Sequence, residues 1–450
     1  MVVVGGIIGA GIFINPYIVA QRLDSPMLVM AAWIAGGVVA LAGALTFAEL
    51  GTLFPSAGGH YAYLRDAYHP LAGFLYGWGL LLMIEGGAIA AVGITFAEYT
   101  LRLVGRPEAS AQVLTVLSIV LVAGVNYVGV KPGSRLLNTF VILKLVPLGL
   151  LIVAGLLLPV PATDIPVPQL VSPGPGTVPG SSVGGGPPAA TGLGGGAALF
   201  FAFGAALIPV MFSYGGWQNA NYVAEEMKNP VRDMPVSLLT GTALVVLVYG
   251  LVNAVYLRTL GHAGLAGTLT PASDAAGALF GDVGDFLITL GIAVSTFGFL
   301  NLTMLAPTRV YYAMARDGLF PARVARLHPR YDTPSVAIVI QTVWAIVLVL
   351  TGTYAQLVDY VVSADWIFFG AAGASLFVFR RAIPLSERPE GVFAVPGYPW
   401  VPGLFVAVAV LIVGSVLWTN PVRSGLGFAL LAAGVPAYLY WNRQRSREEV

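Results

Sequence analysis

The sequence predicts an all-α integral membrane protein with about twelve transmembrane helices. Of its 450 residues, 57% are hydrophobic and 10% are charged, whereas soluble domains carry about 25% charged residues. The apolar residues are gathered into runs of about 20, the length with which a helix crosses a hydrocarbon core of about 30 Å. A large soluble protein needs a charged surface, so this composition excludes that class.

Composition also limits the partners. The formal net charge of +1 gives no reason to expect a nucleic acid or an acidic partner. The chain has no cysteine, which excludes a disulfide framework, thiolate chemistry and a disulfide-linked partner subunit. No cofactor is expected. The first apolar run begins at Met1 without a basic leader or a cleavage site, so we expect no signal peptide and an N-terminus that is truncated.

The apolar runs place the spans along the chain. They lie at residues 1–21, 27–54, 70–103, 110–128, 135–158, 196–226, 235–258, 283–314, 334–351, 354–380, 400–418 and 424–442. Residues 159–195 are dominated by proline and glycine and predict a flexible extracellular loop. The chain therefore divides into five spans (1–158), this loop, five further spans (196–382), and two additional spans with a tail (383–450).

The positive charges predict the orientation. If the N-terminus is cytoplasmic, the inner loops and the tail hold 16 Lys and Arg residues and the outer loops hold 5. Such an excess is typical of cytoplasmic loops. We therefore expect a multi-pass protein of the inner (plasma) membrane with both termini in the cytoplasm. The five outer residues are Arg22, Arg102, Arg106, Arg258 and Arg423.

The first span contains an unusual glycine cluster, GGIIGAGIFINP, at residues 5–16. Each glycine weakens a helix by about 1 kcal/mol. One interpretation is close helix packing through small residues. The other is a helix that breaks inside the membrane, so that its free backbone groups line a cavity.

A second interruption follows the loop, in FSYGGWQNANYVAEEMKNP at residues 212–230. Gly215 and Gly216 interrupt an apolar run, and polar residues follow them. Spans 1 and 6 thus carry matching interruptions at the start of each five-span half, which indicates a 5+5 inverted repeat with a binding site at the midplane. Such a site suits a zwitterion, because helix N-termini offer N–H groups to a carboxylate and C-termini offer carbonyls to an ammonium.

These segments resemble a known family. GGIIGAGIF resembles the first-span motif of the amino acid–polyamine–organocation (APC) superfamily, and FSYGGWQNANYVAEEMKNP is similar to the sixth-span motif of its L-type amino acid transporter branch. WIAGGVVALAGALTFAELGTLFPSAGGHYAYLRDAY resembles the second span of that branch and the loop after it, NTFVILKLVPL its fifth span, and the run from Ser295 to Arg309 its eighth. The resemblance extends along nearly the whole chain and implies a LeuT-type fold.

The resemblance also implies a binding site. It puts the substrate carboxylate on N–H groups near Ala10 and Gly11, and the ammonium on carbonyls near Ile7, Phe212 and Gly215. Many members have serine where this chain has Ala10, so carboxylate binding would rely on the main chain. Phe212 is expected to act as a gate. The residues expected at the substrate are Ile7, Gly9, Ala10, Gly11, Phe212, Ser213, Gly215 and Gly216.

Three charged residues inside spans require an explanation, because a charge within a membrane is functional by default. From the resemblance, we expect Lys144 to replace a sodium ion, with its ammonium near Gly5, Gly6 and Ser295. Glu85 is a possible proton site or a neutral structural carboxyl. Glu49 is expected at the inner membrane interface. Of the histidines, His60, His69, His262 and His328 fall in loops or at span ends and match no metal site.

The sequence therefore predicts a sodium-independent secondary transporter of neutral L-amino acids that works by alternating access as an exchanger or facilitator. Its partners are the amino acid and the lipid bilayer. Proton coupling, or transport of cationic amino acids or amines, remains an alternative. An intramembrane enzyme would need a motif such as HExxH or GxSxG, and neither occurs. A channel is disfavoured because no filter loop repeats.

Overall fold

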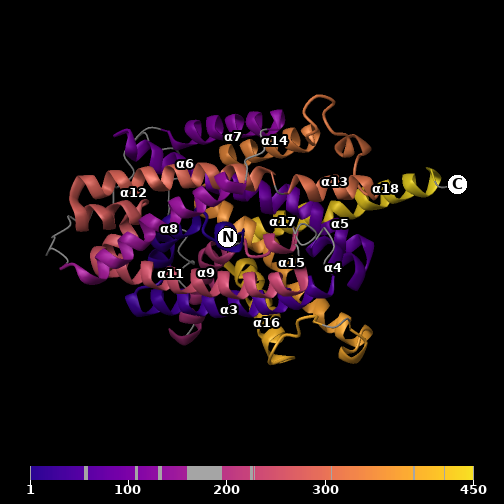
Figure 1. Ribbon diagram of the computed structural model, residues 1–450, viewed down its shortest axis with the longest axis horizontal. Coiled ribbons are helices and arrows are strands. Elements are labelled where there is room, and N and C mark those ends of the chain that lie inside the picture. The colour runs from indigo at the N-terminus through magenta and orange to yellow at the C-terminus, as the bar shows by residue number, and fades with distance from the viewer. Residues whose placement is uncertain are drawn as a thin grey trace.

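The computed structural model describes residues 2–54, 59–106, 110–129, 134–159, 195–222, 227, 229–305, 307–388, 391–419 and 421–448. Among these residues the regular structure is helical and contains no strand. Figure 1 shows the long helices running side by side along the longest axis of the molecule. The side chains of some helical residues, Lys144 among them, lie outside the described part.

The helices up to residue 157 follow the predicted spans, with two additions that the sequence did not predict, a short helix α4 and a π-helix. Their bounds are α1 (Val2–Ile7), α2 (Gly11–Arg22), α3 (Pro26–Leu53), α4 (His60–Ala67), α5 (Pro70–Gly79), the π-helix η1 (Leu80–Ile84), α6 (Glu85–Leu103), α7 (Ala111–Val128) and α8 (Ser134–Leu157).

The remaining helices show that the sequence placed some boundaries only roughly. Their bounds are α9 (Gly195–Tyr214), α10 (Asn219–Tyr222), α11 (Pro230–Gly267), α12 (Pro271–Leu305), α13 (Thr308–Arg316), α14 (Ser335–Thr351), α15 (Tyr354–Ala382), α16 (Trp400–Thr419), α17 (Pro421–Ala432) and α18 (Gly434–Glu448). The predicted span 235–258 ends before a kink at Gly261, and the predicted span 283–314 begins after a kink at Gly281. The φ angles of these two glycines are 66° and 67°.

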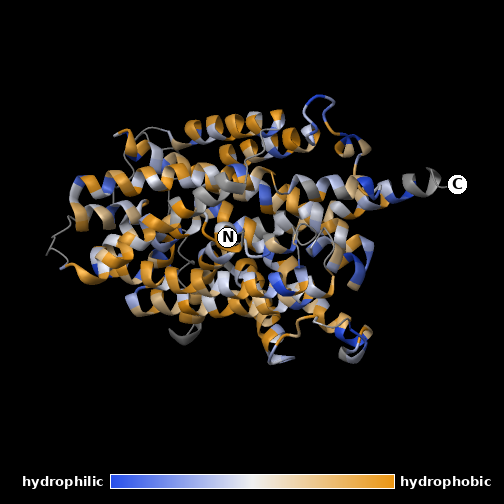
Figure 2. Ribbon diagram, viewed as in Figure 1, coloured by the Kyte–Doolittle hydropathy of each residue, from blue (hydrophilic) through white to orange (hydrophobic). Residues whose placement is uncertain are grey.

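Within the described residues, seven helices are long and apolar enough to cross a membrane, and three shorter apolar helices accompany them. The seven long ones are α3, the continuous rod α5–η1–α6, α7, α11, α12 with α13, α15 and α16. Apolar side chains are exposed on the outer face of α7, such as Leu117 and Leu121. Figure 2 shows hydrophobic residues along the helices and hydrophilic ones gathered at the end that carries α4 and α13. This pattern is that of a protein whose solvent is lipid.

One end of the bundle is held by a buried carboxylate, and we call it the Glu49 end. Glu49 is 0% exposed, and its oxygens lie 2.6 Å from guanidinium nitrogens of both Arg380 and Arg388. The backbone N–H of Val395 donates to the same carboxylate over 2.6 Å. The depth of Glu49 in the membrane stays a prediction, and its side chain is buried against these partners. Arg380 lies in the last turn of α15, and Arg388 and Val395 follow that helix. The end of α15 and the chain after it therefore cover the end of α3 and supply the counter-charges that make burial possible.

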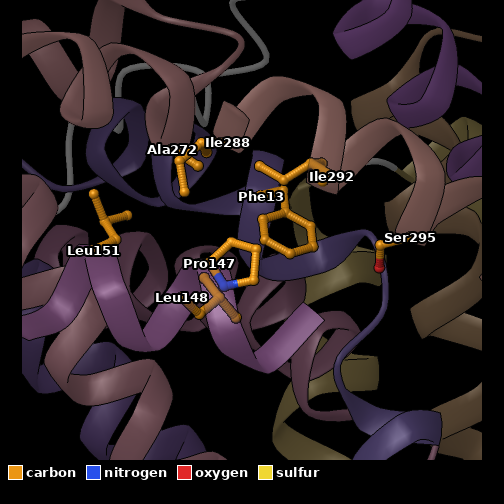
Figure 3. Close-up of a pocket in the computed structure, with 9 residues that line it drawn as sticks. Phe13, Pro147, Leu148, Leu151, Ala272, Ile288, Ile292 and Ser295 are labelled. Carbon is orange, nitrogen blue, oxygen red and sulfur yellow. The ribbon is translucent and has the colours of Figure 1, made fainter. Parts of the chain in front are cut away.

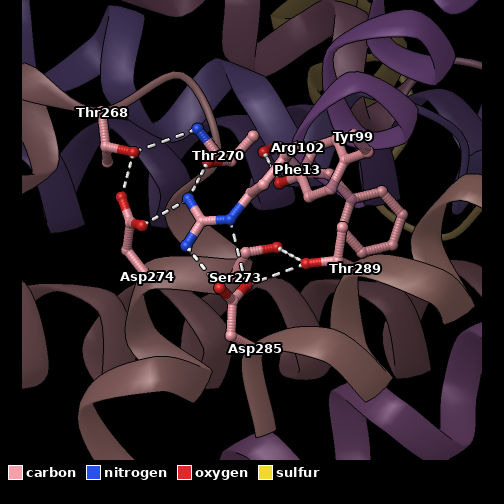
Figure 4. A network of polar contacts seen from close by, with 9 residues as sticks. All are labelled: Phe13, Tyr99, Arg102, Thr268, Thr270, Ser273, Asp274, Asp285 and Thr289. Carbon is pink, nitrogen blue, oxygen red and sulfur yellow. Dashed lines mark hydrogen bonds and ion pairs between the residues drawn. The ribbon is translucent and has the colours of Figure 1, made fainter. Parts of the chain in front are cut away.

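The opposite end, the Arg102 end, is held by a polar network (Figure 4). Arg102, at the end of α6, lies 2.6 Å from Asp274 and 3.0 Å from Asp285. Both acids belong to α12, on either side of its kink at Gly281. The hydroxyl of Thr289 donates to Asp285 over 2.9 Å. Arg102 therefore joins the end of α6 to the two parts of α12, before and after the kink.

Candidate functional site

The first span is interrupted between α1 and α2. Residues Ile8–Ala10 are not helical, and α2 resumes at Gly11. The N–H of Gly9 donates to the carbonyl of Ile7 over 2.7 Å, in place of a helical hydrogen bond. No side chain caps the N-terminus of α2. Because the first N–H groups of a helix have no partner within it, this terminus presents free donors inside the bundle.

The second interruption lies between α9 and α10. Residues Gly215–Gln218 form a turn, and Gly216 has φ = 105°, a conformation that side chains other than glycine's rarely adopt. The N–H of Gly215 contacts the carbonyl of Phe212 at 3.3 Å, and the N–H of Gly216 donates to the side chain of Gln218 over 2.8 Å. Phe212 and Ser213 lie in the last turn of α9.

The two interruptions touch each other. A Cβ atom at Gly216 would overlap the carbonyl oxygen of Gly6, and one at Gly11 would lie 2.7 Å from the Cα of Ser213. Gly9 is in turn covered by the ring of Phe299 on α12, 2.6 Å from where its Cβ would be. The glycines therefore permit backbone to meet backbone at the crossing of the two broken helices.

Buried polar side chains hold the broken helices in place. Asn15 of α2 donates 2.8 Å hydrogen bonds to the hydroxyl of Ser213 and to the carbonyl of Pro209 in α9, and it accepts one from Tyr354 of α15 at 3.1 Å. Tyr249 of α11 donates to the carbonyl of Ile7 over 3.0 Å. Of these residues, only Asn15, polar within an apolar run, is marked by a local pattern in the sequence, and no role was predicted for Tyr249 or Tyr354.

An aromatic cluster lies beside the second interruption. Trp217 stacks on Phe369 of α15, with ring centroids 5.4 Å apart, and meets Phe47 of α3 at 4.8 Å. His60, the first residue of α4, packs against Phe47 at 4.6 Å and is 0% exposed. This burial lowers the pKa of His60 to about 3, so its ring is neutral at physiological pH. Helices α3, α4 and α15 therefore meet at the broken span.

The residues predicted to replace a cation site are only partly described. Ser295 of α12 is 1% exposed, and its hydroxyl has no hydrogen-bond partner among the described residues. It lines a small, mostly apolar pocket between α2, α8 and α12, together with Phe13 and Pro147 (Figure 3). Gly5 and Gly6 lie in α1. Lys144 belongs to α8, but its side chain lies outside the described residues, so its predicted contacts remain a prediction.

Glu85 is the first residue of α6 and directly follows the π-helix. Within the described residues, no group of three or more His, Asp or Glu side chains could hold a metal ion. The residues predicted at the substrate lie in three places. They are found in the bend (Gly9, Ala10), at the adjoining helix ends (Ile7, Gly11, Phe212, Ser213) and in the turn (Gly215, Gly216).

Comparison with known proteins gives the family. The family model described as amino acid permease matches residues 1–440. The serine/threonine exchanger SteT of Bacillus subtilis is 30% identical over 99% of this chain and 95% of its own length. The human cystine/glutamate transporter is 30% identical over 98% of this chain and 84% of its own. The large neutral amino acids transporter small subunit 2 of the mouse is 30% identical over 98% of this chain and 80% of its own length.

The resemblance in the glycine motifs is thus confirmed along the whole chain. Members of the matched family are transporters rather than enzymes, and their substrates are amino acids. The chain, a multi-pass membrane protein, belongs to the amino acid permease family of the APC superfamily.

Proposed function

We propose that this transporter carries neutral L-amino acids by alternating access, as a sodium-independent exchanger or facilitator. The meeting of the two interruptions, where Gly216 lies against the carbonyl of Gly6, is the main support. The uncapped N-terminus of α2 suits a carboxylate, and the carbonyl of Phe212, with one 3.3 Å contact from Gly215, suits an ammonium. The carbonyl of Ile7 already accepts from Gly9 and Tyr249, so an ammonium there would have to displace one of these donors.

The absence of charge in the turn supports a neutral substrate. Gly215 and Gly216 carry no side chain that could neutralise a cationic substrate, and a buried cation needs such a partner. Two of the relatives bear names that specify neutral amino acids, serine/threonine in one and large neutral ones in the other. The name of the first also specifies exchange.

The architecture belongs to the same proposal. The broken helices α1–α2 and α9–α10 stand at the start of segments 1–158 and 196–382, as a 5+5 inverted repeat of the LeuT type requires. Residues 383–450 then supply two further spans, for about twelve in total. The Glu49 end would face the cytoplasm, in keeping with the distribution of Arg and Lys.

Counterflow in proteoliposomes tests the substrate class. Vesicles loaded with unlabelled L-serine or L-leucine should accumulate the labelled amino acid, and L-arginine should compete weakly. The rates should be unchanged when sodium is replaced by N-methylglucamine. Competition by L-arginine equal to that by L-leucine would contradict the neutral substrate. Counterflow that requires sodium would contradict the cation role of Lys144.

A pair of glycine variants tests the site. Gly216→Ala should abolish counterflow, because the added methyl group meets the carbonyl of Gly6 and the backbone has φ = 105°. Gly250→Ala in α11 is the matched control, since nothing lies within 4 Å of its Cβ position. It should keep normal transport. Equal counterflow rates of the two variants would contradict the assignment of the substrate site to this crossing.

Phe212 is the proposed gate because it adjoins the turn in α9. Phe212→Ala should reduce the counterflow rate while the purified protein keeps its melting temperature and its elution volume. A variant with wild-type flux would show that Phe212 is an ordinary packing residue.

A further inference from the structure

The loop between α13 and α14 carries three exposed arginines. We call residues 321–334 the arginine loop, and within it Arg323, Arg326 and Arg330 are exposed. The loop has one acidic residue, Asp332. Across the part of the chain that the structure describes, none of the three arginines takes part in an ion pair. Such a local excess of positive charge attracts anions.

Other arginines at this end of the molecule have acidic partners. Arg380 and Arg388 both meet Glu49, and Arg65 pairs with Asp66. These carboxylates compensate the positive charges within the protein. The arginine loop lacks such compensation among the described residues, so its charge favours an anionic partner outside the chain.

The second half of the loop is folded and is attached to the end of α7. The N–H of His328 donates to the carbonyl of Thr333 over 2.8 Å, and the N–H of Asp332 donates to the carbonyl of His328 over 2.9 Å. The hydroxyl of Thr333 donates to the carbonyl of Tyr127 in α7 over 2.8 Å. The rings of His328 and Tyr331 stack, with centroids 4.7 Å apart. These contacts hold the loop against the neighbouring helix.

The first half of the loop is anchored by a buried side chain. Arg323 lies in a short 3-10 helix, η3 (Ala322–Ala325), and Val324 beside it is 1% exposed. The N–H of Arg326 donates to the carbonyl of Arg323 over 3.2 Å. The backbone that bears the arginines is therefore fixed in both halves, which reduces the entropy lost when a ligand binds.

Apolar faces suited to lipid begin beside the loop. Helix α14 follows it directly and packs against α7. Val339 and Val343 of α14 are 49% and 58% exposed, and Val125 and Val128 of α7 are 37% and 48% exposed. In Figure 2 the hydrophilic loop lies at the end of these two hydrophobic helices. Val339 lies about 8 Å past the end of the loop, at 1.5 Å per residue, and the headgroup layer is about 5–8 Å deep.

We propose that the arginine loop binds the headgroups of anionic phospholipids. Guanidinium groups donate paired, charge-assisted hydrogen bonds to a phosphate, and the acyl chains would then lie against the exposed faces of α7 and α14. Basic clusters next to a membrane helix bind anionic lipids in this way. The surface lies apart from the crossing of the broken helices, so the inference does not depend on which amino acid is carried.

Native mass spectrometry of the purified full chain in detergent tests the proposal, with phosphatidylglycerol and phosphatidylcholine as probes. Phosphatidylglycerol should bind the wild type at least about tenfold more tightly, because choline compensates the charge of the other phosphate. A variant with Arg323→Gln, Arg326→Gln and Arg330→Gln should lose most of this preference. The variant with Arg323→Lys, Arg326→Lys and Arg330→Lys should keep most of it, because the positive charge remains.

The matched control carries Arg106→Gln, Arg232→Gln and Arg381→Gln, three exposed arginines outside the loop. Its net charge changes equally, and it should keep the wild-type preference. An equal loss in the control would overturn the proposal, because net charge alone would then set binding. A wild type without preference would also overturn it, as would inorganic phosphate that competes as strongly as phosphatidylglycerol. Elution volume and melting temperature without added lipid should match the wild type in every variant.

Discussion

Glu49 and Glu85 are both carboxyl groups within apolar helices, yet their surroundings differ. Glu49 meets two guanidinium groups and a backbone N–H. Glu85 directly follows the π-helix at the start of α6 and takes part in no ion pair within the described residues. A buried carboxylate that is paired with cations and hydrogen-bond donors stays ionised and holds its neighbours in place, whereas a buried carboxyl without such partners tends to bind a proton. Because its charge is fully compensated, we expect Glu49 to have a structural role.

The largest effect should come from Glu49→Gln. Removing the charge leaves Arg380 and Arg388 facing each other in a buried site, which costs about 3–5 kcal/mol for a broken buried pair. Thermal unfolding in detergent should show a marked loss of stability. Glu85→Gln is the comparison, and it should unfold near the wild-type temperature at neutral pH. Equal destabilisation by the two variants would erase the distinction drawn above.

An intermediate effect is expected at the Arg102 end. The side chains of Arg102, Asp274 and Asp285 are 28–33% exposed, so water already screens their interactions. Arg102→Gln should destabilise by about 1–2 kcal/mol, less than at Glu49 because the two acids it leaves can hydrate. The same unfolding measurement tests this. A loss of stability as large as that of Glu49→Gln would show that burial of the charged groups does not determine the size of the effect.

His60 gives a smaller effect that depends on pH. Its pKa is lowered to about 3 by burial, while an unfolded chain has a histidine pKa near 6.5. Between these values the unfolded state binds the proton and the folded state does not, so stability falls as the pH falls. Unfolding followed from pH 7 to 4 should show this slope. It should be reduced in His60→Phe, and an unchanged slope would point to other groups.

The smallest effect should come from Arg65→Gln. Arg65 pairs with Asp66 at 2.7 Å and Asp317 at 3.6 Å, but these side chains are 38–42% exposed. Exposed pairs contribute about 0–1 kcal/mol. Added salt should weaken this contribution further. A salt-independent loss above about 2 kcal/mol would mean that α4 is joined to the end of α13 by more than a surface pair.

Local patterns explain what the sequence could predict. The glycine motifs around Gly9 and Gly216 predicted both interruptions, because a break in a membrane helix requires small residues within an apolar run. The contacts that stabilise the breaks left no such trace. Tyr249 meets Ile7 across 242 residues of chain, and Tyr354 meets Asn15 across 339. Only the fold brings these side chains together.

Other features were missed for the same reason. The partners of Glu49 could not be predicted, because Arg380 at the end of α15 and Arg388 after it lie 331 and 339 residues further along the chain. The π-helix before Glu85 could not be predicted, since its sequence LLLMI is as apolar as that of any α-helix.

Helix α15 runs unbroken from Tyr354 to Ala382 and begins with a capping box at Thr353. Along its length it carries Asp359, which pairs with Arg22, and Arg380, which pairs with Glu49. Its amides should therefore exchange with deuterium as one cooperative unit, because no part of it can open without releasing contacts at both ends. Hydrogen exchange would then report the whole helix through any of its peptides.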